Sequence, residues 1–344
     1  MRVSVIVVNW NRCELLRACL NSLAGQIGTG SEIIIVDNGS ADGSPEMVAG
    51  EYSNVRLIRN KENRGFCAAN NQGIAASNAE FIALLNNDAE ADPGWLEALV
   101  GAIEARSDFG MAASKILVWE DPGRIDKAGH LIYPDGQNRG RGSGERDHGQ
   151  YDRAEETLWP DGCAALYRKE MLDAIGGFDE DLFAYADDAE LGLRARIAGW
   201  RCLYTPAAVV RHHRGATLGL RSSRRLELIE RNRVLLAVKL FPLSLLWLNP
   251  CYYLARIVSG AWESAHGRGE AALYPGLKGK LTMAAALIHG DLEALSLAPR
   301  MWRKRREMDR IRKLSSGQVR ELILGNRISL RELSGQSTAD QKNA

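Results

Sequence analysis

The sequence predicts an α/β fold built on a mostly parallel sheet, for three reasons. Short apolar runs alternate with amphipathic stretches from the first residues as far as Val118. The links between them are short, as in right-handed βαβ units. The apolar runs are also nearly continuous, as in strands that are buried on both faces of a sheet. Five strands are therefore expected, at Val3–Val8, Ile33–Val36, Val55–Ile58, Phe81–Leu85 and Met111–Val118.

Helices are expected between these strands. Asn11, with Glu14 three residues on, predicts a capping box at the start of the first helix, whose apolar residues recur at helical spacing. Pro45 marks the start of the second helix, because proline suits the first helical position. Further helices are expected at Phe66–Ser77, after Asp92-Pro93 and at Ala189–Trp200.

The composition indicates an ordinary soluble protein. Its 344 residues suffice for one large domain with a subdomain, or for two domains. The net charge of +1 provides no global field that would attract nucleic acid. The six cysteines form no CxxC pair, which is typical of buried thiols in a reducing compartment. The first apolar run is too short for a signal peptide, so a cytoplasmic location is expected.

The amino-acid composition changes at two places beyond the fifth expected strand. Gly136–Gly149 is rich in glycine and charge, which predicts a mobile surface loop or a lid over a polar substrate. Leu240–Leu248 is strongly apolar, but Pro242, Asn249 and Pro250 interrupt it well short of the ~20 residues that span a bilayer. We expect residues 1–220 to form one domain, 221–333 a helical region and 334–344 a disordered tail.

Arg300–Lys313 holds eight basic residues against two acidic ones, a local net charge of +6. Two interpretations stay open for this segment. It is either a solvated helix face or a surface that contacts an anionic membrane, where each basic residue contributes about 1 kcal/mol. The apolar segment nearby suits the second interpretation, a peripheral attachment to the inner face of the plasma membrane.

Polar residues follow the fourth expected strand directly. Asn86, Asn87 and Asp88 stand at its carboxyl end, and ligands of open α/β sheets bind at that edge. A carboxylate there suits a hard divalent cation, although an Asx-rich turn that merely ends the strand has the same composition. The GxGxxG and GxxxxGK[ST] patterns are missing after the first strand, which counts against dinucleotide and ATP sites of those types.

Six motifs occur in an order that resembles glycosyltransferase family 2, the inverting GT-A enzymes, and most closely its rhamnosyltransferase-like branch. They are VSVIVVNWNR, VDNGSADGS, NRGFCAANN, LLNNDAE, GGFDEDLFAYADDAELGLRARIAGW and the two histidines at 212–213. The resemblance covers about residues 3–217 well and the helical remainder weakly. It implies a GT-A-type sheet, a nucleotide-sugar donor, a divalent metal and a hydroxyl acceptor on a glycan or a lipid-linked glycan.

The resemblance also implies roles for single residues. Asp188, or its neighbour Asp187, would be the general base, and Asp88 and His212 would hold the metal. Asn86 replaces the first aspartate of the family's DXD motif, and Asp187 replaces a glutamate. The donor would meet Val8, Asn9, Trp10, Asp37, Arg64, Asn87 and Asp88. The acceptor would meet the segment that contains Trp159, Gly162 and Cys163.

The chemistry favours Mn²⁺ over Mg²⁺, because histidine matches magnesium poorly. dTDP-rhamnose is the leading donor, followed by UDP-linked hexoses. Two alternatives remain open, a nucleotidyltransferase and a scaffold that binds nucleotide sugar without turnover. The sequence does not predict an oligomeric state, and His130 is expected to be a surface or structural residue.

Overall fold

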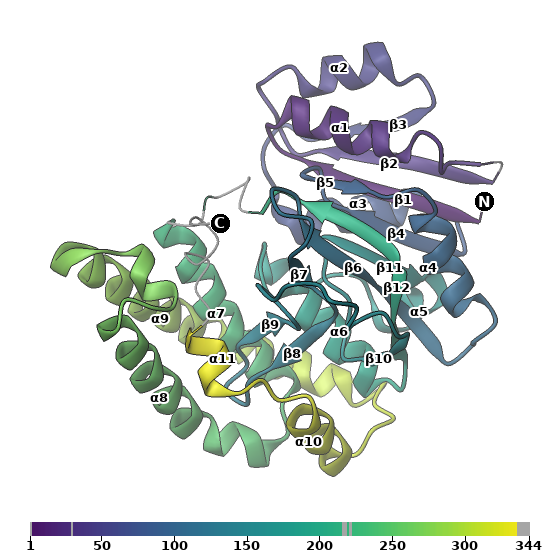
Figure 1. The fold of residues 1–344 in the computed structure, drawn as a ribbon. Coiled ribbons are helices and arrows are strands. Elements are labelled where there is room, and N and C mark those ends of the chain that lie inside the picture. The colour runs from purple at the N-terminus through teal and green to yellow at the C-terminus, as the bar shows by residue number, and fades with distance from the viewer. Residues whose placement is uncertain (1, 29, 215–218, 220–221, 336–344) are drawn as a thin grey trace. The chain divides into compact units, whose positions relative to one another are not determined.

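The structure is a computed structural model that describes residues 2–28, 30–214, 219 and 222–335 (Figure 1). The chain divides into two compact units. The first, here the sheet unit, comprises Met1–His130 and Glu145–Ala216. The second, the helical unit, comprises Leu131–Gly144 and Thr217–Ala344. Residues 131–144 lie inside the range expected for the first domain, but they belong to the helical unit.

One large, mostly parallel sheet forms the centre of the sheet unit, which confirms the expected fold class. In spatial order its strands are β10 (Glu155–Thr157), β12 (Arg201–His212), β6 (Phe109–Val118), β11 (Ala164–Arg168), β4 (Phe81–Leu85), β1 (Val3–Asn9), β2 (Ser31–Asp37) and β3 (Val55–Arg59). β5 (Ala89–Ala91) pairs with β12, and β7 (Ile125–Lys127) pairs with β6. All five expected strands are present.

The register of the sheet aligns the carboxyl ends of its parallel strands. β1 pairs in parallel with β2 and with β4, and the last pair between β1 and β2 joins Asn9 to Asp37. β11 runs antiparallel to β4 and β6, and its first residue, Ala164, pairs with Leu85, the last residue of β4. The beginning of β11 therefore lies beside the end of β4.

Helices flank this sheet and bury its apolar side chains. They are α1 (Cys13–Leu23), α2 (Ser44–Glu51), α3 (Gly65–Ala76), α4 (Trp95–Glu104), α5 (Lys169–Ile175), α6 (Asp187–Ile197) and the 3₁₀ turn η1 (Glu180–Leu182). Leu16 of α1, Ile35 of β2 and Trp95 of α4 lie in one buried core. The helix expected at Ala189–Trp200 begins two residues earlier than expected, so both neighbouring aspartates lie in its first turn.

The predicted capping box at the start of α1 is wrong. Asn11 has a φ of 48°, and its side chain accepts a hydrogen bond from the backbone N–H of Ala41 instead of capping the helix. Asp42 caps α1 from another loop, because its carboxylate accepts hydrogen bonds from the N–H groups of Arg12 and Cys13. A cap supplied by a distant residue leaves no local sequence signal.

The prediction of a mobile loop at Gly136–Gly149 is also wrong. β8 (His130–Ile132) pairs there with β9 (Asn138–Gly140), and Gly140 and Ser143 are buried. Gly136 has a φ of 103° and lies so close to Arg233 that a Cβ would be 2.7 Å from its carbonyl oxygen. Glycine therefore serves close packing here.

The helical unit is built around two long packed helices, α7 and α9. Its helices are α7 (Ser223–Leu240), α8 (Leu243–Ala265), η2 (Glu270–Leu273), α9 (Gly276–Met308), α10 (Ser316–Gly325) and α11 (Leu330–Gly335). Pro250 lies inside α8, so it does not end the apolar segment as expected. Of the described helices, α9 alone has the length and apolar composition that a membrane crossing requires.

Buried ion pairs tie the helical unit together. Glu230 of α7 contacts Arg233 at 2.6 Å and Arg256 of α8 at 2.8 Å. Arg256 also contacts Asp135, whose side chain is fully buried. α11 ends at Gly335, so the expected disordered tail at 334–344 begins within a helix, and its part from residue 336 on lies outside the described residues.

Candidate active site

The carboxyl ends of β4, β1 and β2 are joined by a row of side-chain hydrogen bonds. The Asn87 amide donates to the Asn9 side-chain oxygen at 2.7 Å, and the Asn9 amide donates to Asp37 at 3.1 Å. The second carboxylate oxygen of Asp37 accepts from the N–H of Ser40 at 3.0 Å. Three expected donor-site residues, Asn9, Asp37 and Asn87, are therefore brought together, and all three are buried.

The other expected donor-site residues lie around this row. Val8 and Trp10, on either side of Asn9, are half-buried. Arg64 stands directly before α3 with an exposed side chain, and its backbone N–H donates to Asn38 at 3.0 Å. Asn38 follows Asp37, so the loop that carries Arg64 is tied to the end of β2.

Asp88 and His212 face each other, as the sequence led us to expect. Asp88 Oδ1 lies 3.4 Å from His212 Nε2. The other ring nitrogen, Nδ1, contacts Asp126 Oδ2 at 2.8 Å, and Asp126 also pairs with Arg214 at 2.9 Å. His213 points elsewhere: its backbone N–H donates to the Asp88 carbonyl, and its ring stacks on Trp119.

These residues fit a divalent cation. Asp88 is 5% exposed, and its Oδ1 accepts no hydrogen bond from any described residue, so its nearest polar contact is the His212 ring nitrogen 3.4 Å away. An imidazole whose other nitrogen is held by a carboxylate is the usual arrangement of a metal-binding histidine. Burial raises the pKa of Asp88, but His212, the Asp88 backbone N–H and His213 together hold the pKa below its ordinary value, which favours the ionised carboxylate.

A second acidic group lies at the start of α6, after a strained turn. Phe183, Tyr185 and Ala186 have φ values of 65°, 69° and 54°, in the left-handed region that non-glycine residues rarely adopt. Such residues cost about 1–3 kcal/mol each and persist where the surroundings hold them. Asp187 and Asp188 follow this turn directly.

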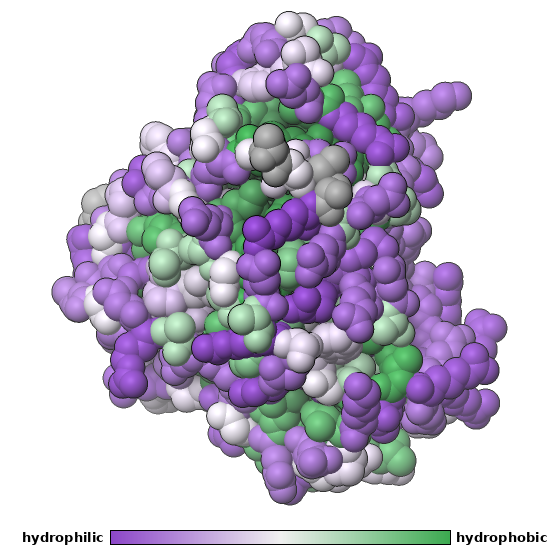
Figure 2. Space-filling model, turned by 90° about the vertical axis from the view of Figure 1, so that its right-hand side faces the viewer, coloured by the Kyte–Doolittle hydropathy of each residue, from purple (hydrophilic) through white to green (hydrophobic). Residues whose placement is uncertain are grey.

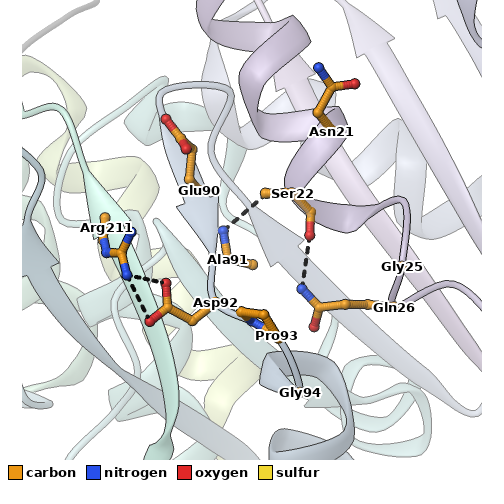
Figure 3. A pocket seen from close by; sticks show the side chains of 10 residues that line it. All are labelled: Asn21, Ser22, Gly25, Gln26, Glu90, Ala91, Asp92, Pro93, Gly94 and Arg211. Carbon is orange, nitrogen blue, oxygen red and sulfur yellow. Dashed lines mark hydrogen bonds and ion pairs between the residues drawn. The ribbon is translucent and has the colours of Figure 1, made fainter.

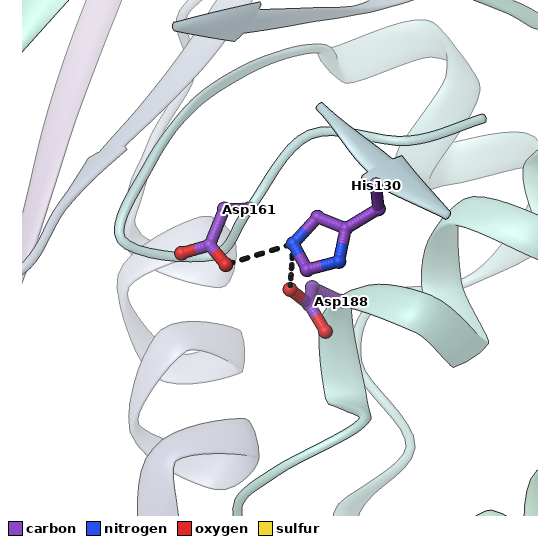
Figure 4. Close-up of side chains that lie close together, drawn as sticks. All are labelled: His130, Asp161 and Asp188. Carbon is purple, nitrogen blue, oxygen red and sulfur yellow. Dashed lines mark hydrogen bonds and ion pairs between the residues drawn. The ribbon is translucent and has the colours of Figure 1, made fainter. Parts of the chain in front are cut away.

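The Asp188 carboxylate is held from three sides. Its Oδ1 accepts from the Ala189 N–H at 2.7 Å, and its Oδ2 accepts from the Gly162 N–H at 3.3 Å. His130 Nε2 lies 3.5 Å from the same Oδ2 and 2.8 Å from Asp161 Oδ2. Figure 4 shows this one ring nitrogen between the two carboxylates.

Lys127 completes the group, because its Nζ lies 2.6 Å from Asp161 Oδ2. By spacing alone, His130, Asp161 and Asp188 could hold a cation. Lys127 already supplies a positive charge to the carboxylate oxygen that such a cation would need. Burial raises the pKa of Asp161, but Lys127 and His130 outweigh it and hold the pKa well below its usual range.

In contrast to Asp161, the two aspartates of α6 have raised pKa values. Burial raises the pKa of Asp188, with Asp161 adding to the rise and His130 and Lys127 opposing it. Burial also raises the pKa of Asp187, and the neighbouring Asp188 charge raises it further. A carboxylate with a raised pKa is a stronger base, so this pair suits the removal of a proton from a hydroxyl.

The expected acceptor segment links the two acidic groups. The Cys163 carbonyl accepts from the Asn86 N–H at 2.8 Å, next to the residues that carry Asp88. Gly162, one residue earlier, donates to Asp188. Trp159 is fully buried, so its indole has no exposed surface for an acceptor; it stacks on His130, with ring centroids 5.9 Å apart.

The sequence did not single out four residues of this site. His130 was expected to be a surface or structural residue, and it is buried beside Asp188. Asp126 and Asp161 carry buried charge and Lys127 a half-buried one, in stretches without apolar periodicity, so no pattern marks them. The one available signal was the Pro160-Asp161-Gly162 turn, which places a carboxylate next to the expected acceptor segment.

A separate surface pocket of about 450 Å³ contains none of these residues (Figure 3). Two of its polar contacts are made within the protein: Ser22 accepts from the Ala91 N–H, and Asp92 pairs with Arg211 at 3.0 Å, as Figure 3 shows.

Comparison with known proteins agrees with this architecture. Over 236 residues the chain is 30% identical to the uncharacterized protein y4gI of Sinorhizobium fredii, covering 63% of this chain and 25% of that protein. It is 28% identical to N-acetylglucosaminyl-diphospho-decaprenol L-rhamnosyltransferase of Mycobacterium tuberculosis, covering 62% of this chain and 77% of that one. The chain thus spans a quarter of the first relative and about three quarters of the second.

The fold is similar to that of mannosyltransferase PcManGT from Pyrobaculum calidifontis, in complex with GDP-Man and Mn²⁺. The TM-score is 0.52 at 21% identity, over 86% of this chain and 87% of that one. This likeness supports a GT-A-type fold.

Residues 4–176 match Glycosyl transferase family 2, and they include the strand ends that carry Asn9, Asp37 and Asp88. The match ends before Asp188 and His212, which the contacts described above bring to the same edge of the sheet. It covers half of the chain. The chain therefore belongs to glycosyl transferase family 2.

Proposed function

We propose that this protein is an inverting glycosyltransferase that moves a sugar from a nucleoside-diphosphate donor to a hydroxyl group. One observation carries the proposal: a continuous set of contacts joins Asp88 and His212 to Asp188 through the segment Asp161–Cys163. A cation site and a basic carboxylate on one edge of a sheet are the two groups that single displacement requires.

The donor side is assigned to the strand ends. Asp88 and His212 would hold Mn²⁺ or Mg²⁺, with Mn²⁺ favoured by the imidazole ligand. The chemistry that such an ion supplies is Lewis-acid stabilisation of the diphosphate that leaves. Asp37 would bind the nucleobase, and Arg64, exposed beside it, would meet the donor's phosphates. The hydrogen bonds of Asn9 and Asn87 join Asp37 to the end of β4.

The acceptor side is assigned to α6 and the segment before β11. Asp188 takes the proton of the acceptor hydroxyl while that oxygen attacks the anomeric carbon from the face opposite the leaving diphosphate. Asp188 is a better candidate than Asp187, since His130 and Lys127 favour its ionised form, whereas the charge of Asp188 favours protonation of Asp187. Gly162 and Cys163 would border the acceptor.

dTDP-rhamnose is the proposed donor, and a lipid-linked glycan is the proposed acceptor. The support is the relative from Mycobacterium tuberculosis, whose name gives a rhamnosyl transfer to a diphospho-decaprenol-linked sugar. UDP-linked hexoses are the second choice of donor. A thermal-shift screen of nucleotide sugars with Mn²⁺ separates these donors by the rise in melting temperature that each produces.

Two variants test the roles of the carboxylates. Asp188→Asn should lower turnover by about 10²–10⁴-fold and leave nucleotide binding near normal, because general-base catalysis contributes that much. Asp88→Ala should remove the effect of Mn²⁺ on nucleotide affinity in calorimetry. Asp173→Asn, at an exposed position of α5, is the matched control and should behave as wild type. Wild-type turnover in Asp188→Asn would reject the base, and unchanged Mn²⁺ dependence in Asp88→Ala would reject the cation site.

Analysis of the released products separates the glycosyltransferase from the two alternative functions. A glycosyltransferase incubated with Mn²⁺ and donor alone releases some nucleoside diphosphate as water replaces the acceptor. A scaffold that binds nucleotide sugar releases none. A nucleotidyltransferase releases inorganic diphosphate when given a nucleoside triphosphate and a sugar phosphate, so that product would overturn the proposal.

A further inference from the structure

Exposed apolar side chains gather on two helices of the helical unit. Twelve of the fourteen exposed large apolar residues in the described part of the chain belong to α8 and α9. By contrast, the view from the right-hand side of Figure 1 shows a mostly hydrophilic surface on which hydrophobic residues form small groups (Figure 2). The two sets are Leu243, Trp247, Leu248, Leu254, Val258 and Trp262 on α8, and Leu277, Leu281, Ile288, Leu292, Leu295 and Trp302 on α9.

On α8 these residues form one stripe with helical spacing. Trp247 is 83% exposed, Leu254 63% and Trp262 66%. None of the exposed positions of α8 carries a charge. The two charged residues of this helix, Arg256 and Glu263, have side chains only 14% and 15% exposed. Its outward face is therefore uncharged along the whole helix.

α9 has the same arrangement, and its other face is fixed to α7. Gly290 lies so close to α7 that a Cβ would be 2.6 Å from the Glu227 carbonyl oxygen. Glu293 pairs with Arg231 at 2.6 Å, and Asp291 pairs with Arg233 at 3.3 Å. With one face held against α7 by ion pairs, only the other face of α9 is free to meet lipid. An amphipathic helix of this kind lies in the plane of an interface.

Polar contacts link α8 to α9 and to α7 on the sides away from their apolar stripes. The Tyr253 hydroxyl of α8 donates to Asp291 of α9 at 2.8 Å. Arg256 of α8 and Arg233 of α7 share Glu230 as a partner. The inward faces of α7, α8 and α9 thus form one polar network, and the outward faces of α8 and α9 are left apolar. We call these outward faces the α8–α9 face.

Cations stand at both ends of the α9 stripe. Lys278 and Lys280 are exposed at its start, and Arg300, Arg303 and Arg306 are exposed at its end beside one exposed acid of this helix, Glu307. Between Leu281 and Pro299 no exposed position of α9 is Lys, Arg, Asp or Glu. A second copy of the chain would meet this stripe with cations at both of its own ends, so either direction of pairing would bring like charges together. An anionic surface meets no such repulsion.

We propose that the α8–α9 face binds the surface of an anionic phospholipid bilayer, with both helices lying along the interface. The apolar stripes would enter the boundary between headgroups and acyl chains, and the tryptophans suit that depth. Lys278, Lys280, Arg303 and Arg306 would meet anionic headgroups. This binding is measured without donor or acceptor, so its test does not depend on the proposed reaction.

Co-sedimentation of the full chain with vesicles tests the proposal. The wild type should bind vesicles of phosphatidylglycerol and phosphatidylcholine in equal parts, bind phosphatidylcholine alone much less, and lose binding as salt is raised. Leu254→Glu combined with Val258→Glu should lower the vesicle partition by at least about tenfold, since two apolar side chains and their insertion are lost. Arg303→Gln and Arg306→Gln should each lower it by about fivefold.

Matched controls keep these results specific to the face. Ala49→Glu combined with Ala75→Glu adds the same two charges at exposed helical positions of α2 and α3 and should bind as wild type. Arg320→Gln removes a cation from an exposed position of α10 and should have no effect. All the substituted positions are exposed, and circular dichroism verifies that each variant folds.

A second measurement locates the contact. Brominated phospholipids should quench tryptophan fluorescence of the wild type, and the double variant Trp247→Phe, Trp262→Phe should bind as well but be quenched less. The proposal is overturned if the wild type stays in the supernatant with both kinds of vesicle, or if the glutamate variant binds as the wild type does. It is also overturned if the wild type binds no vesicle and sediments as a dimer that the glutamate variant makes monomeric.

Discussion

Gly192 of α6 is a position where one added methyl group tests how the site is supported. A Cβ at this position would lie 2.1 Å from Trp159 Cβ and 2.6 Å from Trp159 Cγ. Trp159 is fully buried and stacks on His130, which lies beside the Asp188 carboxylate. Gly192→Ala should therefore push Trp159 away from α6 and disturb the group that holds Asp188.

The expected change in stability follows from two opposing effects. Alanine is favoured over glycine in a helix interior by about 0.8–1.0 kcal/mol. Overpacking a full core costs about 1–3 kcal/mol, and the overlap with Trp159 belongs at the upper end of that range. Gly192→Ala should therefore lower the free energy of unfolding by roughly 1–2 kcal/mol.

Gly101 of α4 provides the matched control. A Cβ there has no atom within 4 Å, so Gly101→Ala should raise the free energy of unfolding by about 0.5–1 kcal/mol. Chemical denaturation followed by circular dichroism measures both variants. Turnover should fall in Gly192→Ala, with kcat affected more than KM, and should not change in Gly101→Ala. Equal stabilities for the two variants would refute the reasoning, because the contact with Trp159 would then cost nothing.

Two further predictions concern the acidic groups. The raised pKa values of Asp187 and Asp188 mean that their ionisation destabilises the folded state, so Asp187→Asn should be more stable than the wild type at neutral pH. This gain in stability should vanish below the ordinary aspartate pKa of 3.8, where the carboxyl groups are protonated in both the folded and the unfolded state. Denaturation at several pH values measures the difference in the free energy of unfolding. Asp309→Asn, at an exposed position, is the control. Asp126→Ala should lower Mn²⁺ affinity by about 10–100-fold in calorimetry, because Asp126 holds the His212 ring; wild-type affinity would exclude Asp126 from that role.

The strands could be predicted from the sequence because burial on both faces of a sheet imposes a local pattern. Phe81–Leu85 was predicted with its observed bounds, and the other four strands are longer than expected by one or two residues at one or both ends. The cap of α1 by Asp42 could not be predicted, since it depends on a loop about thirty residues away. The ordered segment around Gly136 was missed because a composition rich in glycine is typical both of mobile loops and of close packing.

The proximity of the expected site residues could be predicted where they stand at strand ends or in motifs; their roles stay predictions. Asn87 and Asp88 follow from the sheet edge, whereas Asn9, Asp37 and the pairing of Asp88 with His212 were expected from the resemblance. His130 could not be found in this way. Its place beside Asp188 depends on Trp159 and on a turn in another part of the chain, and neither leaves a periodic signal.

β11 runs antiparallel to its neighbours β4 and β6, and its direction determines which loops lie at the carboxyl edge of the sheet. In a purely parallel sheet, only the loops that follow the strands lie at the carboxyl edge. Here the loop that precedes β11 also lies at this edge, although it comes from a different part of the chain. Changes in Asp161–Cys163 can therefore alter the segment beside Asp188 while the row formed by Asn87, Asn9 and Asp37 keeps its place. Under the proposed function, the acceptor side and the donor side could then change independently of each other.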